Sequence, residues 1–226
     1  MRRISTDCRF VQTALVLRDM AREAMSRTVP EPWHARKILD GALTVLKFSQ
    51  APERAEAEVI ITADLGEAAR LNPTYVDAFI NQGAEGLYAH ALNQAERNLG
   101  KDHPAAAYVI AKRADMYLAQ VRLWEADRLY EQVVGLLDRP ASPDPELLAH
   151  ALVKRGDVRL SLGCYAEAEV FYLRGIDLLL ENPASDQKLL AHAFRQSADM
   201  LEKTGREQHA RGLRQRAEEI EAALHR

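Results

Sequence analysis

The sequence predicts an all-α solenoid of about five antiparallel helix pairs, and three observations lead to this class. Helix-forming residues dominate the 226-residue chain, and aromatic residues make up only 6% of it, which favours helices over sheets. Proline and glycine signals divide the chain into about ten helical stretches joined by short turns. Residue types also recur with a period of 42 residues. Helices joined by such short links must run antiparallel to their neighbours.

In the first half of the chain, prolines and one glycine set the expected helix boundaries. The turns are expected around Pro30, at Ala51-Pro52, at Asn72-Pro73 and from Gly100 to Pro104, because proline disfavours a continuing helix and glycine often follows a helix end. The expected helices span residues 7–27, 32–49, 52–71, 74–99 and 104–120.

In the second half the same signals are more regular. Pro140 to Pro145, Gly163, Asn182-Pro183 and Gly205 mark the turns. The expected helices span residues 123–138, 145–162, 165–181, 186–203 and 206–225. No segment shows the alternating pattern of a β-strand.

The internal repeat places small and aromatic residues at matching positions. A small residue on each helix of a pair lets the two backbones approach, and a tyrosine one turn later fills the wedge where they diverge. The recurring residues are Ala84, Ala126, Ala168 and Ala210, then Tyr88, Tyr130 and Tyr172, and the pairs Ala114-Asp115, Gly156-Asp157 and Ala198-Asp199.

Two consecutive units carry a resemblance to a known family. One contains the run from Gly100 to Pro104, Glu125-Ala126-Asp127 and Tyr130, and the next contains Gly163, Tyr165, Glu167-Ala168-Glu169 and Phe171-Tyr172. These residues resemble tetratricopeptide (TPR) repeats of the 42-residue, kinesin-light-chain-like type, most clearly over residues 101–181. The resemblance implies a right-handed α-α superhelix that binds other proteins.

The chain is expected to be one TPR-like domain over residues 1–226. Its segments would be divergent N-terminal helices (1–50), a degenerate repeat (52–99), two repeats (101–142 and 143–184), and a degenerate repeat that ends in a polar C-terminal cap (185–226). Upstream, Asn72-Pro73 stands where the small-acidic pair belongs. Residues 66–88 also fit a 34-residue type of junction, so two registers remain open there.

Composition excludes several functions. A net charge of −3 gives no basic excess for nucleic acid, and the first residues contain no apolar stretch long enough for a signal or a membrane span. Cys8 and Cys164 are too few and too far apart for a disulfide framework, so a cytoplasmic protein is expected. Phosphate loops, zinc motifs and nucleophile elbows are missing from the sequence, so we expect no enzyme activity, cofactor or metal.

Two residue types need separate consideration. His150 and His192 share a repeat position, and a metal bridge, a lining role in a groove and a half-buried packing role are all open. A lining role is favoured, because equivalent helices lie roughly 10 Å apart, which is long for two ligands of one ion.

Trp33 and Trp124 are expected to pack in the interior.

The resemblance implies that the first helix of each pair lines a concave groove. Its exposed stripe would present an aromatic or imidazole row, a Lys-Lys-Gln row and a row of aspartates. These candidate partner-binding residues are Tyr108, Lys112, Asp115, His150, Lys154, Asp157, His192, Gln196 and Asp199. Each lysine could instead simply pair with the aspartate of its own helix. If the stripe binds a ligand, its aspartates would repel a terminal carboxylate and favour a basic ligand.

The leading functional hypothesis is a scaffold or adaptor that binds a protein or peptide in the concave groove. An alternative is a ligand-responsive regulatory or sensory module, in which a bound peptide or small molecule controls a partner. An all-α metal-dependent hydrolase is the third hypothesis. Self-association into a homo-oligomer also stays open, because the ends of a solenoid expose apolar stripes.

Overall fold

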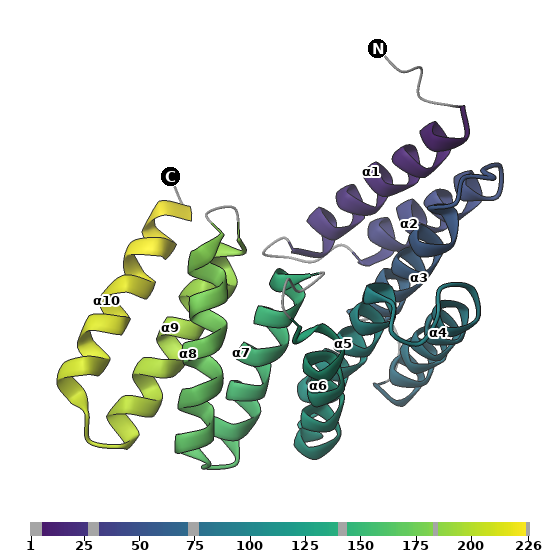
Figure 1. The fold of residues 1–226 in the computed structure, drawn as a ribbon. Coiled ribbons are helices and arrows are strands. Elements are labelled where there is room, and N and C mark those ends of the chain that lie inside the picture. Colours follow the sequence, from purple (N-terminus) through teal and green to yellow (C-terminus); the bar gives the residue numbers. More distant parts are fainter. Residues whose placement is uncertain (1–5, 27–31, 72–76, 140–143, 183–184, 225–226) are drawn as a thin grey trace. The chain divides into compact units, whose positions relative to one another are not determined.

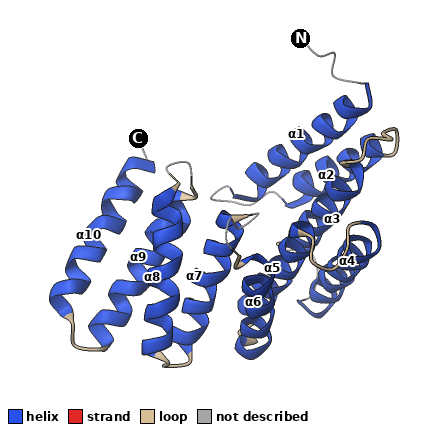
Figure 2. Ribbon diagram, in the orientation of Figure 1, coloured by secondary structure: helices blue, strands red, loops and turns tan. Residues whose placement is uncertain are grey.

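The computed structural model consists of helices joined by short turns (Figure 1). It describes residues 6–26, 32–71, 77–139, 144–182 and 185–224. The helices are α1 (Thr6–Ser26), α2 (Pro32–Leu46), α3 (Arg54–Arg70), α4 (Asp77–Asn98), α5 (Pro104–Ala119), α6 (Leu123–Leu137), α7 (Pro145–Ser161), α8 (Tyr165–Glu181), α9 (Gln187–Lys203) and α10 (Glu207–Leu224). Across these described ranges there is no β-strand (Figure 2), so the all-α prediction is confirmed.

The predicted turn residues act through known capping geometry. Asp144 accepts a hydrogen bond from the Leu147 amide at 2.9 Å at the start of α7, and Pro145 occupies the first turn. Gly163 and Gly205 follow α7 and α9 with φ of 76°, the left-handed conformation in which glycine ends a helix without steric cost. The turn Asn72-Pro73 lies outside the described residues.

The chain divides into two compact units, Met1–Met116 and Tyr117–Arg226. In unit 1, α1 packs on α2, α3 packs on α4, and α3 also contacts both α1 and α2. Its core is rich in alanine and leucine, with Leu39, Leu46 and Ile61 fully buried. The helices α1 and α2 lie in the segment 1–50 that is predicted to form divergent N-terminal helices.

In unit 2, α7 packs on α8 and α9 packs on α10, while α6 contacts α7 and α9 contacts both α7 and α8. Its core centres on Tyr172, Leu179 and Met200. The last helix buries only Ala210 and Ala217 of its described residues, and Leu224 at its end is 44% exposed. So little burial fits the polar cap expected at this end of the chain.

The upstream register is resolved by one contact within unit 1. The Tyr88 ring lies against Gly66, where a Cβ atom would stand 2.8 Å from Tyr88 Cε1, and the Tyr88 hydroxyl donates to Glu67 at 3.3 Å. In unit 2, Tyr172 lies in the same way on Gly156 and donates to Asp157 at 2.9 Å. Gly66-Glu67 therefore takes the place of the small-acidic pair that the 42-residue register assigned to Asn72-Pro73.

Candidate functional site

The nine candidate residues are all intermediate in solvent exposure. Each is neither in the core nor fully exposed, as expected for side chains along one stripe at the edge of a helix interface. They lie on three first helices: α5 carries three of them in unit 1, and α7 and α9 carry six in unit 2. We call these residues the first-helix stripe.

In unit 1, Tyr108 belongs to a buried polar network. Its hydroxyl donates to Asp64 of α3, and Arg18 of α1 donates to Asp64 at 2.7 Å and to the Tyr108 oxygen at 3.2 Å. The Asp64 side chain is only 2% exposed, so it depends on these two partners for compensation. Burial, followed by the nearby Asp64 carboxylate, raises the pKa of Tyr108 and keeps its hydroxyl protonated. Tyr108 thus ties α5 to α3 and α1.

Lys112 lies over the Tyr108 ring, with its Nζ 5.6 Å from the ring centroid. Burial lowers the pKa of Lys112, but the surrounding acidic groups, among them Asp115, outweigh it, so the net direction is upward and the ammonium stays charged. Lys112 and Tyr108 are therefore brought together, as their spacing of one helical turn requires.

In unit 2, Asp157 is the centre of a second network. Its carboxylate accepts hydrogen bonds from Lys154 Nζ at 3.0 Å and from the Tyr172 hydroxyl at 2.9 Å, and His192 Nε2 lies 2.9 Å away. Burial raises the pKa of Asp157, but the His192 hydrogen bond and the Lys154 charge outweigh it, so the pKa lies below its ordinary value. The Asp157 carboxylate joins α7, α8 and α9.

The Lys154–Asp157 pair bears directly on the two interpretations of the stripe. The ion pair between Lys154 and Asp157 forms within α7, so the Asp157 charge is largely neutralised by a residue of the protein itself. Asp199 of α9 differs, because its side chain is 40% exposed and is held by Arg214 of α10 at 2.7 Å. Of these two aspartates in unit 2, Asp199 is the one open to a ligand.

The remaining stripe residues in unit 2 are His150 and Gln196. The His150 ring meets the Tyr130 ring edge-on, with centroids 6.4 Å apart, whereas His192 is held by Asp157. The two histidines therefore have different partners. Within the described residues, no group of three or more His, Cys, Asp or Glu side chains is arranged to hold a metal ion.

Sequence reasoning missed the partners that are distant along the chain. Arg18 and Asp64 were not singled out, although an aspartate within the apolar run from Val59 to Leu65 is a signal that a buried charge needs a partner. The expectation that Trp124 packs in the interior is wrong, since it is 67% exposed. The side chain of Trp33 lies outside the described residues.

Comparison with known proteins gives matches at the level of structure. No protein-family model and no curated protein matches the sequence.

None of the helices in the described ranges combines the length and apolar character that crossing a membrane requires.

Three solved structures are similar over nearly the whole chain. A Podosopora anserina kinesin light chain with nearly identical TPR-like repeats aligns with a TM-score of 0.58 at 16% identity, covering 99% of this chain and 100% of that one. A point variant of the same Podosopora anserina protein aligns with a TM-score of 0.59 at 15% identity, covering 98% and 99%. The protein BtubC (BKLC) from P. vanneervenii aligns with a TM-score of 0.64 at 16% identity, covering 98% and 93%. The chain therefore has the all-α, TPR-like repeat fold of these kinesin light chain structures, as the sequence predicted.

Proposed function

We propose that this protein is an interaction scaffold that binds a partner polypeptide through the six stripe residues on α7 and α9 of unit 2. The observation that carries the proposal is the shared half-burial of these six residues. Half-buried side chains are held in position by their neighbours and still present atoms to a ligand, so a partner gains contact area at little cost in side-chain entropy. The TPR-like fold, which generally serves protein interaction, is consistent with this role.

In unit 2, α7 and α9 contact each other, so His150, Gln196 and Asp199 lie on neighbouring helices. Asp157 is a poor target for mutation, because its loss would leave Lys154 and the buried Tyr172 hydroxyl without their partner. Variants should therefore change stripe residues other than Asp157.

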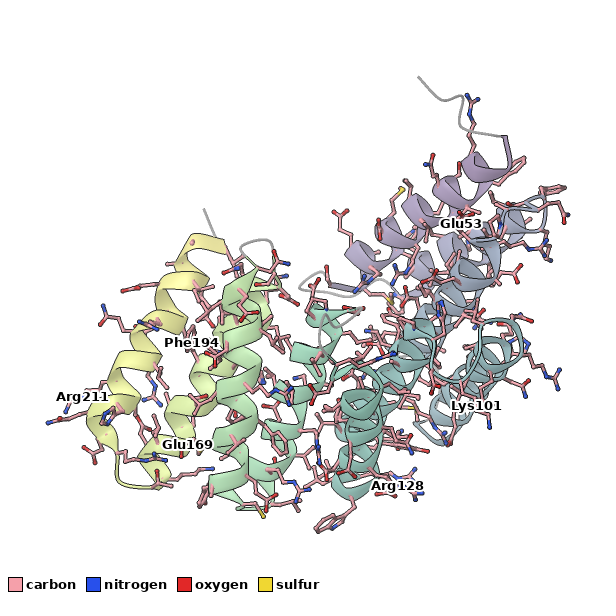
Figure 3. All side chains as sticks on the ribbon, in the orientation of Figure 1. Glu53, Lys101, Arg128, Glu169, Phe194 and Arg211 are labelled. Atoms are coloured by element: carbon pink, nitrogen blue, oxygen red, sulfur yellow. The ribbon has the colours of Figure 1, made fainter. Side chains whose placement is uncertain are left out.

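The test is quantitative affinity capture from a lysate of the source cells with the full-length chain as bait. We expect the double variant His150→Ala/Gln196→Ala to lose a specific subset of partners. The matched control is Arg128→Ala/Arg211→Ala, which changes two exposed residues of the second helices α6 and α10 (Figure 3). Retention of every partner by the stripe variant, or equal loss by the control, would contradict the proposal.

A second variant tests whether the bound partner segment is basic or acidic. Arg214 pairs with both Asp199 and Glu202, so Arg214→Ala leaves two carboxylates without this partner, and that of Asp199 lies on the stripe. A basic partner segment should then bind more tightly, and an acidic segment more weakly, with the difference shrinking at high salt. No change in affinity for any captured partner would mean that Asp199 lies outside the contact surface.

A further inference from the structure

Helices α8, α9 and α10 of unit 2 enclose a cavity of about 220 Å³ that shares no residue with the first-helix stripe. Figure 3 labels two of its lining residues, Glu169 on α8 and Phe194 on α9. Most of the lining is apolar, and α8 contributes Leu173, Ile176 and Leu180. Small-molecule sites usually measure about 300–1,000 Å³, so this volume suits a single side chain better than a whole cofactor.

One of the polar lining residues of this cavity is buried. Ser197 lines the cavity, is only 5% exposed, and its Oγ has no hydrogen-bond partner within the described part of the chain. A buried hydroxyl without a partner is destabilising, because it has given up its hydrogen bonds to water. A ligand that supplies a hydrogen-bonding group would recover that loss.

The preceding pair of helices shows what fills the corresponding space there. Ser197 corresponds to Arg155, which lies 42 residues earlier in the repeat. The Arg155 guanidinium lies between α6 and α8, with Nε 3.1 Å from Asp127 and a terminal nitrogen 3.3 Å from Glu131. It also lies over the Phe171 ring at 4.6 Å from the centroid. The space is thus filled by the protein itself in one repeat and left open in the next.

The charges around Arg155 have apolar counterparts at the open cavity. Glu131 corresponds to Leu173, and Arg159 to Leu201. The one acid retained is Glu169, which corresponds to Asp127 and is already held by two hydrogen bonds from Arg206, at 2.7 and 2.8 Å. Because the carboxylates that hold the guanidinium are replaced or occupied, the cavity favours an apolar occupant over a cation.

The mouth of the cavity extends into an exposed apolar stripe on α8. Val170, Leu173 and Leu180 are 62%, 57% and 54% exposed and lie on one face of the helix. Asp177 also lines the cavity, is exposed, and forms no ion pair with any residue in the described ranges. Arg216 of α10 lines the cavity too, with its guanidinium over the Phe194 ring at 5.9 Å from the centroid. The surface thus combines an apolar recess, an adjoining apolar strip and the exposed carboxylate of Asp177, with Arg216 held over Phe194.

We propose that this cavity binds one tryptophan or tyrosine side chain of a partner helix that carries a lysine or arginine one turn from the aromatic residue. The ring fills the recess and its N–H or O–H donates to Ser197 Oγ, while the apolar face of the helix covers Leu173 and Leu180. The cation pairs with Asp177. Aromatic anchors of this kind supply large contact area with few rotamers to fix, and they dominate many interfaces. The proposal does not depend on the function of the first-helix stripe.

The first test uses N-acetyl-tryptophanamide as a probe of the recess. Its binding is measured through changes in the backbone amide chemical shifts of the full-length protein. We expect saturable shifts at residues around Ser197 and Leu213, and much smaller shifts with N-acetyl-leucinamide. Ser197→Ala should weaken binding about two- to tenfold, the value of one hydrogen bond. Ser197→Leu fills the recess and should abolish binding. Saturable shifts elsewhere, or none in this region, would overturn the proposal.

The second test uses two alanine-rich helical peptides with a central tryptophan, flanked one turn on each side by lysines in one and by glutamates in the other. The lysine peptide should bind the wild-type chain severalfold more tightly, and Asp177→Lys should reverse the preference. Leu173→Glu, at an exposed position that leaves folding intact, should abolish binding of both peptides. Equal affinity of the two peptides for wild type and Asp177→Lys would contradict the charge assignment.

A second copy of the chain is the competing occupant, since its own Trp124 is exposed. Sedimentation velocity on the wild type and on Trp124→Ala distinguishes the two cases. A monomeric wild type that binds the lysine peptide supports a separate partner. Self-association that disappears both in Trp124→Ala and in Leu173→Glu would overturn the proposal in favour of a contact between copies.

Discussion

The pair α3/α4 in unit 1 and the pair α7/α8 in unit 2 bury a tyrosine on a glycine in the same way, although the chain between the two residues differs in length. Tyr88 follows Gly66 by 22 residues, whereas Tyr172 follows Gly156 by 16. In both pairs the tyrosine hydroxyl donates to the acid directly after the glycine. The packing contact is therefore kept while the connecting segment varies by six residues, because a surface connection tolerates added length at small entropic cost.

The two pairs also share a base three residues from the acid. Arg70 bonds Glu67 at 2.6 Å in α3, and Lys154 bonds Asp157 at 3.0 Å in α7. At the acid they differ, since Asp157 has an additional partner in His192 on a third helix. We expect the α7/α8 pair to be the more sensitive to changes at its acid. The following variants probe the contacts of the two pairs.

The largest expected effect is from removal of the tyrosine rings. Tyr88→Ala and Tyr172→Ala should each lower the free energy of unfolding by about 3–5 kcal/mol, because both rings are fully buried and leave cavities that the helices cannot close. Urea denaturation followed by circular dichroism measures the change. Leu173→Ala on the exposed side of α8 is the control and should stay within about 0.5 kcal/mol of wild type. A small cost for only one tyrosine would show that the two pairs are not equivalent.

The next effect concerns the glycines beneath the rings. A Cβ at Gly156 would stand 2.6 Å from Tyr172 Cε1, so Gly156→Ala should destabilise by about 1–2 kcal/mol after its gain in helix propensity is subtracted. Gly135→Ala is the matched control, because no atom lies within 4 Å of its Cβ position in α6, and it should stabilise by about 0.5–1 kcal/mol. The same denaturation experiment reports both. Stabilisation by Gly156→Ala would mean that the ring moves aside freely.

The third effect is the pH dependence contributed by Asp157. Its pKa is lower in the folded state than in the unfolded chain, so the stabilisation is complete above the unfolded value of about 3.9 and is lost as pH falls through the folded value. Asp157→Asn should reduce stability at neutral pH and flatten the acid limb of the stability curve below about pH 4. Unfolding free energies across the acid range measure this. An unchanged slope would show that Asp157 does not contribute to acid unfolding.

The smallest effects are those of the bases. Arg70→Met and Lys154→Met should each cost about 0.5 kcal/mol, because their pairs are partly exposed and lie within one helix. The cost should shrink in high salt, which screens such pairs. Thermal unfolding of both variants at low and high salt checks the prediction. A salt-independent cost would indicate that the lost packing of the side-chain stem, and not its charge, matters.

The placement of the elements could be predicted well from the sequence, while the polar partnerships could not. The ten helices in the described part of the chain were anticipated within a few residues, because Pro145, Gly163 and Gly205 act on the local backbone whatever surrounds them. The pairing of Lys154 with Asp157 was one of two stated alternatives for the same reason of local spacing. Arg18, Asp64 and Tyr108 meet only after three helices have packed, so no pattern along the chain revealed that network.

The sequence by itself determined that the chain forms helix pairs and, to within a few residues, where each helix begins and ends, because propensity, capping and periodicity act over short distances. Only the tertiary structure decided that Gly66, and not Asn72-Pro73, holds Tyr88, and that Asp157 is satisfied internally while Asp199 is left more exposed. It also decided that the space filled by Arg155 is open beside Ser197. These outcomes depend on side-chain contacts between helices, and such contacts form only when segments distant in the chain pack together.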